Sequence, residues 1–239
     1  MPARTTRDPA VVLGHVSGGR VLDVATGDGQ FIGFLREGLK NHAEIIGIDL
    51  EPAEQVLFDE RFRDHPGITF ELGDVLDHGW PDASFDTVSI AHALCRFHDR
   101  GLVLARLVKL LRPGGTLVVA DEYTDQDTDA AEMFVELHAW WAAVDRASGQ
   151  THVPSLRRHQ LVALFTGLGL TDLRLFDVDD PDADPMDPAM MESIDGVIDR
   201  TIERATGRPE LQQEGRILRE RMHRVGVRMP VSLVAVGRT

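Results

Sequence analysis

The sequence Val-Leu-Asp-Val-Ala-Thr-Gly-Asp-Gly-Gln-Phe occupies residues 21–31. A short apolar run, typical of a strand buried in a parallel sheet, leads directly into a turn of small residues. Gly27 and Gly29 allow backbone N–H groups to approach a ligand closely, and the positive end of a helix expected over 30–40 faces the same place. The stretch therefore predicts a strand, a ligand-binding glycine loop and a helix, as in nucleotide-binding α/β domains.

The alternation of apolar runs and helical patterns continues outward from this unit, from residue 20 to about 180. The pattern predicts strands at 20–24, 44–49, 68–72, 85–91, 116–120, 172–178 and 231–236, and helices at 30–40, after Pro52, and at 102–111, 128–146 and 155–168. We therefore expect a single domain over residues 1–239, an α/β fold with a doubly wound, seven-stranded, mainly parallel sheet.

A segment at residues 179–229 interrupts this cadence between the last two strands. It begins with an acidic, proline-rich stretch and continues as two amphipathic helical patterns. If the sixth strand is parallel, the segment leaves from the ligand-binding end of the sheet. It is predicted to be either a lid over an acceptor pocket or a dimer interface, and the lid would supply adaptable apolar contacts from Met186, Met190, Met191 and Met222.

Composition limits the partners of the chain. The 239 residues are 43% hydrophobic and 27% charged, and the formal net charge is −14. So acidic a surface repels phosphate backbones and anionic lipid, and we expect no nucleic acid and no membrane as partner. With Cys95 as its one cysteine the chain has no internal disulfide, and without an apolar targeting segment we expect it to be cytoplasmic.

Two observations disfavour a nicotinamide-dependent oxidoreductase. The dinucleotide pattern requires a third glycine at position 32, which is Ile32. The short-chain dehydrogenases require a Tyr-x-x-x-Lys pair, and Tyr123 has Asp127 at that offset. This enzyme class therefore stays the alternative to the interpretation below.

Further motifs follow the glycine loop in order. Asp49 ends the second strand, 20 positions after Gly29, and Gly73-Asp74-Val75 follows the third strand. The other motifs are Phe85-Asp86, Ala91-His92-Ala93-Leu94, and Leu111-Arg112-Pro113-Gly114-Gly115-Thr116-Leu117. In this ordered set, residues 20–122 resemble the class I S-adenosylmethionine-dependent methyltransferases, especially the ubiquinone/menaquinone-type enzymes that act on small molecules.

The resemblance implies S-adenosylmethionine as cofactor and a set of residues that bind it. In that family the first motif holds the methionine part, the acidic residue of strand two accepts the ribose hydroxyls, and the turn after strand three contacts adenine. Carried over to this sequence, the cofactor-binding residues are Asp23, Ala25, Gly27, Gly29, Asp49, Leu50, Asp74, Val75 and Ala91. The sequence departs from the family at Ala25, where glycine is common, and at Asp28, where a small hydroxyl residue is frequent.

The resemblance also implies an in-line transfer of a methyl group to the oxygen, nitrogen or carbon of a small-molecule acceptor. The catalytic candidates beyond strands four and five are His92, as a general base, and Tyr123. Asp121 and Glu122 lie where catechol-type enzymes hold magnesium, but the third ligand would be His92, so we expect no metal. A homodimer and a protein that binds the cofactor without catalysis both stay open.

Overall fold

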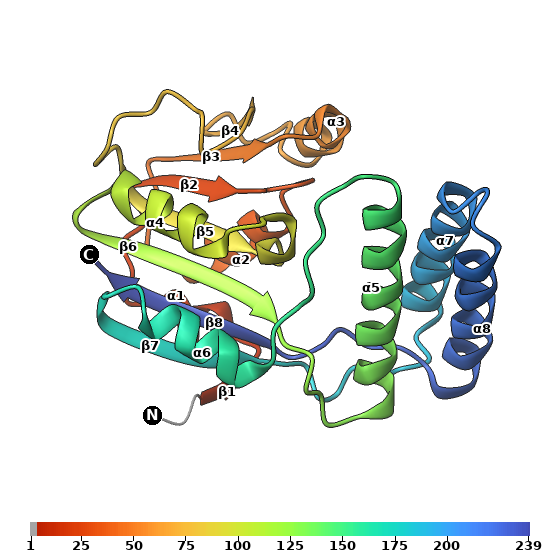
Figure 1. Cartoon of the computed structure of the whole chain (residues 1–239). Helices are drawn as coiled ribbons and strands as arrows, with labels where there is room; N and C mark the ends of the chain where they lie inside the picture. The colour runs from red at the N-terminus through yellow and green to blue at the C-terminus, as the bar shows by residue number, and fades with distance from the viewer. Residues whose placement is uncertain (1–3) are drawn as a thin grey trace.

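The computed structural model describes residues 4–239. Figure 1 shows a central sheet covered by helices, with a separate group of helices at one end. The strands are β1 (Arg4–Thr6), β2 (Arg20–Val24), β3 (Glu44–Asp49), β4 (Ile68–Leu72), β5 (Phe85–Ala91), β6 (Leu111–Glu122), β7 (Thr171–Val178) and β8 (Ser232–Arg238). The helices are α1 (Pro9–Leu13), α2 (Gln30–Gly38), α3 (Pro52–Arg61), η1 (Leu94–Arg96, a 3₁₀ turn), α4 (Arg100–Leu110), α5 (Asp129–Ala147), α6 (Arg158–Thr166), α7 (Pro188–Arg204) and α8 (Pro209–Val225).

The strand order β1-β7-β8-β6-β5-β2-β3-β4 confirms the doubly wound, mainly parallel sheet. Only β8 runs antiparallel to its neighbours, β6 and β7, within residues 4–239. The predicted number of seven strands was one too low, because β1 also pairs with β7. This edge strand has three residues, Arg-Thr-Thr, and carries no apolar run from which it could be predicted.

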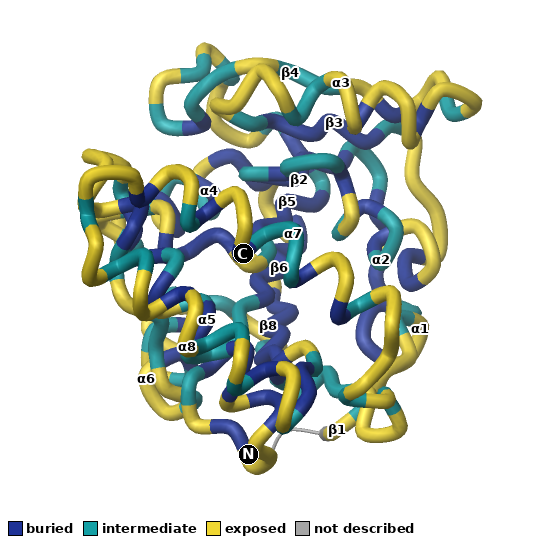
Figure 2. Tube along the Cα trace, turned by 90° about the vertical axis from the view of Figure 1, so that its right-hand side faces the viewer, coloured by how far each residue is buried: buried dark blue, intermediate teal, exposed yellow. Residues whose placement is uncertain are grey.

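Both faces of the sheet are buried under helices, which explains the nearly continuous apolar runs of the central strands. One core cluster joins these strands to α4 and α6 through Leu104, Leu107 and Phe165. The other joins them to α1, α2 and α3 through Leu13, Leu35 and other residues. The burial map in Figure 2 shows the central strands as the most deeply buried part of the trace.

Side chains of the sequence set where several helices begin. The hydroxyl of Thr128 accepts a hydrogen bond from Ala131 N at the start of α5, and the Asp187 carboxylate accepts one from Met190 N at the start of α7. Pro52 occupies the first turn of α3, where its missing N–H costs nothing. The helix predicted over 155–168 is shorter than expected, because residues 155–157 belong to the loop before α6 and the helix ends before Gly167.

The predicted pair of helices between the last two strands packs with α5 into a third layer. Figure 1 shows this layer beyond the carboxyl ends of the parallel strands. Its own core contains Leu137 and Trp140 of α5, Ile194 and Ile198 of α7, and Met222 of α8. Trp140 Nε1 donates a hydrogen bond of 2.8 Å to Leu211 O, which ties α5 to α8. Within residues 4–239, no helix is both long and apolar enough to cross a bilayer.

Candidate functional site

The glycine loop follows β2, and a buried carboxylate anchors it. Asp23 is 1% exposed and accepts hydrogen bonds from Thr26 Oγ1 at 2.7 Å and from Ser89 Oγ at 2.6 Å. Burial raises the pKa of Asp23 to about 6, although both hydrogen bonds lower it. Asp23 therefore holds the loop against β5, with each of its carboxylate oxygens bonded to a hydroxyl of the chain.

A second carboxylate holds the loop from the side. Asp49, at the end of β3, accepts a hydrogen bond of 2.9 Å from Gly27 N through Oδ2 and one of 3.0 Å from Glu51 N through Oδ1. Two carboxylate oxygens offer about four acceptor positions in total, so both retain capacity for a ligand hydroxyl. The structure thus brings together two residues, Gly27 and Asp49, that are predicted to share one ligand.

Three residues of the loop adopt the left-handed backbone conformation: Ala25 with φ +52°, Gly27 with φ +54° and Gly29 with φ +84°. The nearest heavy atom to a Cβ built at Gly27 is Glu54 Oε2 at 3.9 Å, so Gly27 is needed for its backbone angle. A Cβ at Gly29 would lie 2.3 Å from the ring of Phe62. Ala25 takes this conformation with a side chain, at a cost of about 1 kcal/mol or more.

The ends of β3 and β4 present an apolar surface beside two acidic residues. Asp49 pairs with Leu72 in the parallel register, and Leu50 follows directly. Leu50 is 65% exposed and Leu72 is 53% exposed, so both side chains are accessible to a ligand. Asp74 Oδ1 accepts a hydrogen bond from Leu76 N and so shapes the turn, in which Val75 is buried.

His92 lies just beyond the carboxyl end of β5, after Ala91. It adopts φ +53°, and its backbone N–H donates to Ala120 O on β6 at 2.9 Å. Its Nδ1 lies 3.5 Å from Glu122 Oε1, and its imidazole is 42% exposed. Desolvation lowers the pKa of His92, while Asp121 raises it, so the ring is a neutral proton acceptor at neutral pH.

Two half-buried carboxyl groups lie close to His92. Burial raises the pKa of Asp121 to about 7, against a lowering by His92, and burial likewise raises the pKa of Glu122 to about 7. Both groups consequently change charge close to neutral pH. Acidic groups with pKa values shifted this far gather at functional sites more often than elsewhere.

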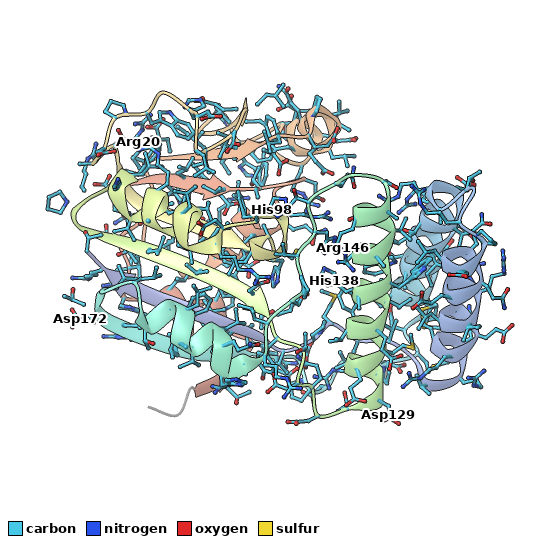
Figure 3. All side chains as sticks on the ribbon, in the orientation of Figure 1. Arg20, His98, Asp129, His138, Arg146 and Asp172 are labelled. Atoms are coloured by element: carbon cyan, nitrogen blue, oxygen red, sulfur yellow. The ribbon has the colours of Figure 1, made fainter. Side chains whose placement is uncertain are left out.

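A cavity of about 310 Å³ opens next to these groups, between the end of β6 and α5. Its lining consists of Glu122, Tyr123, Thr124, Phe134, Val135, His138, Ala139, Ala142, Arg146, Pro154, Ser155 and Pro230. Figure 3 labels His138 and Arg146 on the side of α5 that faces the sheet. Tyr123 is 9% exposed, and burial raises its pKa to about 12, so its hydroxyl keeps its proton at neutral pH.

The methionines predicted to roof an acceptor lie elsewhere. Met191 and Met222 are buried in the core shared by α5, α7 and α8, and Met186 is 48% exposed. Within residues 4–239, the lining of the cavity includes none of the four methionines. The reason is that α5 lies between the cavity and the helices α7 and α8. These two helices pack against the opposite side of α5.

Some residues of the site carry no clear sequence signal. Thr26 and Ser89 hold Asp23, and Ser89 lies 66 residues away from it along the chain. On α5, His138 borders the cavity, whereas Trp140 is 1% exposed and belongs to the core. The helical period alone could have separated these two, because positions two apart face different directions.

Comparison with known proteins matches the segment that carries the glycine loop. Residues 22–119 match the family model described as a methyltransferase domain. Over 113 residues the chain is 41% identical to a demethylmenaquinone methyltransferase of Deinococcus radiodurans, covering 47% of this chain and 46% of that protein. Over 125 residues it is 32% identical to an O-methyltransferase of Penicillium expansum, covering 51% of this chain and 45% of that protein.

The likeness to solved structures extends over nearly the whole chain. The crystal structure of the [4+2]-cyclase SpnF superimposes with a TM-score of 0.64 at 17% identity, covering 97% of this chain and 79% of that one. At such low identity the likeness concerns the fold alone. The sequence matches to curated relatives, in turn, span about half the length of those proteins.

Proposed function

We propose that the chain binds S-adenosylmethionine and transfers its methyl group to a small molecule, on the premise that residues 22–119 match the family model of a methyltransferase domain. The observation that carries the proposal is the hydrogen bond from Gly27 N to Asp49. It joins the glycine loop to the acidic residue of the next strand, in the arrangement that nucleotide-binding α/β sheets use at the carboxyl ends of their strands.

The residues at these strand ends fit an adenosyl group. Asp49 has acceptor capacity left for the ribose hydroxyls, and the exposed Leu50 and Leu72 offer an apolar surface to a flat ring. Asp74 and Val75 would border the ring from the turn after β4, and Ala91 would border the donor from β5. Gly27 and Gly29 would present their backbone to the methionine part, with Ala25 beside them and Asp23 holding the loop. When bound, the cofactor supplies an electrophilic methyl group.

His92 is our candidate for the group that accepts the proton of the acceptor. Its neutral imidazole lies at the end of β5, and Glu122, 3.5 Å away, would stabilise the charge that forms on the ring. Contacts of this kind commonly shorten in a substrate complex. Tyr123, which keeps its proton, would donate a hydrogen bond that orients the acceptor.

The cavity beside Glu122 is our candidate for the acceptor site. Phe134, Val135 and Ala142 give it apolar walls, and its volume of about 310 Å³ suits a small molecule. Glu122 and Arg146 both line the cavity, so it is the net charge of −14 that favours a neutral or cationic acceptor over an anionic one. The nucleophilic atom of the acceptor can be oxygen, nitrogen or carbon.

Two functions other than methyl transfer would be recognised by which cofactor the chain binds and whether the cofactor is turned over. A nicotinamide-dependent oxidoreductase would bind NAD, although Ile32 replaces the third glycine of the dinucleotide pattern. A protein of this fold can also bind the cofactor without methyl transfer. The structural neighbour described as a [4+2]-cyclase is a reason to test turnover separately from binding.

The segment at 179–229 is proposed to act on the acceptor site through α5. Its helices α7 and α8 hold α5 in place by burying a shared core, and α5 in turn forms one wall of the cavity. We also propose that the chain forms a homodimer through the outer face of α7 and α8, and that it is located in the cytoplasm. Sedimentation analysis of the purified protein tests the homodimer, and cell fractionation tests the location.

Titration calorimetry with S-adenosylmethionine, S-adenosylhomocysteine and NAD tests the proposed cofactor. We expect the first two to bind and NAD not to bind. Asp49→Ala should weaken binding about 10- to 150-fold, because a hydrogen bond to a charged group contributes about 1.5–3 kcal/mol. Binding of NAD in place of S-adenosylmethionine would overturn the proposal, as would unchanged affinity in folded Asp49→Ala.

Two further variants control this experiment. Asp59→Ala removes an exposed carboxylate from α3 and should leave affinity unchanged. Asp49→Asn keeps an oxygen that can accept from Gly27 N, so it separates loss of ribose acceptors from loss of the loop contact. An acceptor screen with labelled methyl groups then distinguishes an enzyme from a binding protein.

A further inference from the structure

Three side chains with metal-ligating atoms converge at the inner wall of α5. Cys95 comes from η1, His138 from α5 and His152 from the loop that precedes α6. One ligand atom from each lies within 4.8 Å of the others. Cys95 is 5% exposed and His152 is 1% exposed, whereas His138 also borders the cavity. A soft thiol and two imidazoles are ligands that zinc prefers.

In both histidines, Nδ1 contacts a polar side chain outside the cluster. His152 Nδ1 lies 2.8 Å from Asp145 Oδ2, and His138 Nδ1 lies 3.3 Å from Ser155 Oγ. With these partners on Nδ1, Nε2 of each ring lies toward the centre of the cluster, where the two Nε2 atoms contact each other. A carboxylate that orients a histidine through its other nitrogen is the usual support behind a metal ligand.

The distance between the two Nε2 atoms fits a shared ion. His152 Nε2 and His138 Nε2 are 3.3 Å apart. Two nitrogens that bind one tetrahedral zinc ion at about 2.0–2.1 Å each are separated by about 3.3–3.4 Å. If both rings donate from Nδ1, two lone pairs face each other here, and a cation between them removes the repulsion.

Two arginines and one carboxylate lie beside the cluster. Burial opposes the charge of Asp145, yet hydrogen bonds from His152, Arg96 and Arg204 lower its pKa below the ordinary value. Zinc binds the neutral form of an imidazole and the deprotonated form of a thiol. Arg96 and Arg204 both donate hydrogen bonds to Asp145, which holds their charges beside a carboxylate.

Backbone contacts hold the three segments together independently of any ion. Val153 N donates to Cys95 O at 2.8 Å, which fixes the loop against η1. Arg146 Nη1 donates to His152 O at 2.8 Å, which fixes the same loop against α5. The ligand atoms therefore lie on a framework that is already ordered, and such preorganisation favours tight binding.

We propose that Cys95, His138 and His152 form a binding site for one Zn²⁺ ion, a site that goes beyond the proposed methyl transfer. Binding forms an Sγ–Zn bond and two Nε2–Zn bonds, and the thiol proton of Cys95 leaves to solvent. Three protein ligands leave the fourth tetrahedral position open to water or to a ligand donor atom. The ion joins α5 to η1 and to the loop before α6.

Zinc titration of the full-length, tag-free chain tests the site. The protein is stripped with a chelator, dialysed, and titrated with ZnCl₂ in competition with a chromophoric chelator. We expect one ion per chain, and a loss of affinity of more than about 100-fold in Cys95→Ser and in His152→Gln, because even supporting residues cost about 10- to 100-fold. Co²⁺ bound to the unmodified chain should show a thiolate-to-metal charge-transfer band.

The matched control is His98→Gln. His98 is exposed and lies near the same loop, with Nε2 3.0 Å from Thr151 Oγ1, and its loss should leave zinc affinity unchanged. Zinc affinity in the unmodified chain no higher than in Cys95→Ser would overturn the proposal. Where a variant fails to fold, the cobalt spectrum of the unmodified chain decides, and absence of the thiolate band overturns the site. In that case the two imidazoles form a hydrogen-bonded pair only.

Discussion

His92 combines a strained backbone with a position at the end of β5. A left-handed conformation is uncommon for residues other than glycine, although histidine adopts it more readily than most. The hydrogen bond from His92 N to Ala120 O holds this conformation in place. Strain of this kind costs about 1–3 kcal/mol and concentrates at functional sites, where the surrounding structure maintains it.

The pair His92 and Glu122 predicts a pH profile for turnover. As pH falls through about 7, Glu122 gains a proton and no longer stabilises a charged imidazole, so kcat/KM should decrease. Glu122→Gln should remove this dependence, and His92→Gln should lower kcat by about 10²- to 10⁴-fold, the usual contribution of a general base. Rate profiles from about pH 5 to 9 measure both effects.

The control for the profile is Glu132→Gln, an exposed carboxylate in the first turn of α5. It should keep the pH dependence of the unmodified chain. A limb near pH 7 that persists in Glu122→Gln would assign the titration to another group. Unchanged turnover in His92→Gln would mean that the reaction proceeds without this base.

At the scale of elements, α5 has two faces with different tasks. Phe134, His138 and Ala142 border the cavity, while Leu137 and Trp140 pack into the core with α7 and α8. At Gly215, α8 packs closely against Trp140 of α5. A Cβ built there would lie 2.3 Å from Trp140 Cζ2. The position of the cavity wall therefore depends on a glycine outside the cavity.

Gly215→Ala should destabilise the protein although alanine is the better helix former. Overpacking costs about 1–3 kcal/mol, which exceeds the gain of about 1 kcal/mol in helix propensity. Gly196→Ala, on α7, is the matched control, since a Cβ there meets only the flexible end of Arg200 at 3.4 Å. Chemical denaturation compares the variants. Equal stability of both would mean that Trp140 moves aside without cost.

At the scale of the whole molecule, acidic groups with raised pKa values oppose stability at neutral pH. Burial raises the pKa of Asp23 to about 6 and those of Asp121 and Glu122 to about 7. Carboxyl groups of the unfolded chain titrate near about 4. The contribution of these groups to stability is therefore present below about pH 4 and is lost as pH rises through about 7.

Because this contribution is lost as the carboxyl groups ionise, we predict that thermal stability falls between about pH 6.5 and 8. Below about pH 6.5, His138 acts in the opposite direction, because its folded pKa of about 4 lies under that of the unfolded chain. Asp121 and Glu122 together should remove about 1 kcal/mol of stability over this interval, or a few degrees in Tm. Calorimetry at constant ionic strength measures the change.

The double variant Asp121→Asn/Glu122→Gln should flatten the dependence of Tm on pH. Asp59→Asn/Glu60→Gln, which changes two exposed carboxylates of α3, removes the same formal charge and should keep the slope. An equal slope in all three proteins would attribute the pH dependence to the net charge of −14 and not to Asp121 and Glu122.

The sequence alone determined the sheet and the glycine loop with its neighbouring acidic residues, because these depend on local patterns; that they bind a cofactor stays a prediction. Apolar runs of five to seven residues, such as those at 20–24 and 85–91, predict buried strands wherever they occur. The glycines of the loop and the acidic residues at the ends of β2 and β3 follow from the same short stretches. The three-residue strand β1 escaped prediction since it lacks such a run.

Only the tertiary structure decided which distant side chains meet. Ser89 reaches Asp23, Glu122 reaches His92, and Cys95 reaches His138 and His152, over separations that no periodicity encodes. From the sequence alone we expect no metal site, and this expectation stays untested. The candidate ligands could not be found there because they come from three unrelated segments. Such contacts depend on how α5 and its two supporting helices pack across the carboxyl end of the sheet, and packing is a property of the folded chain as a whole.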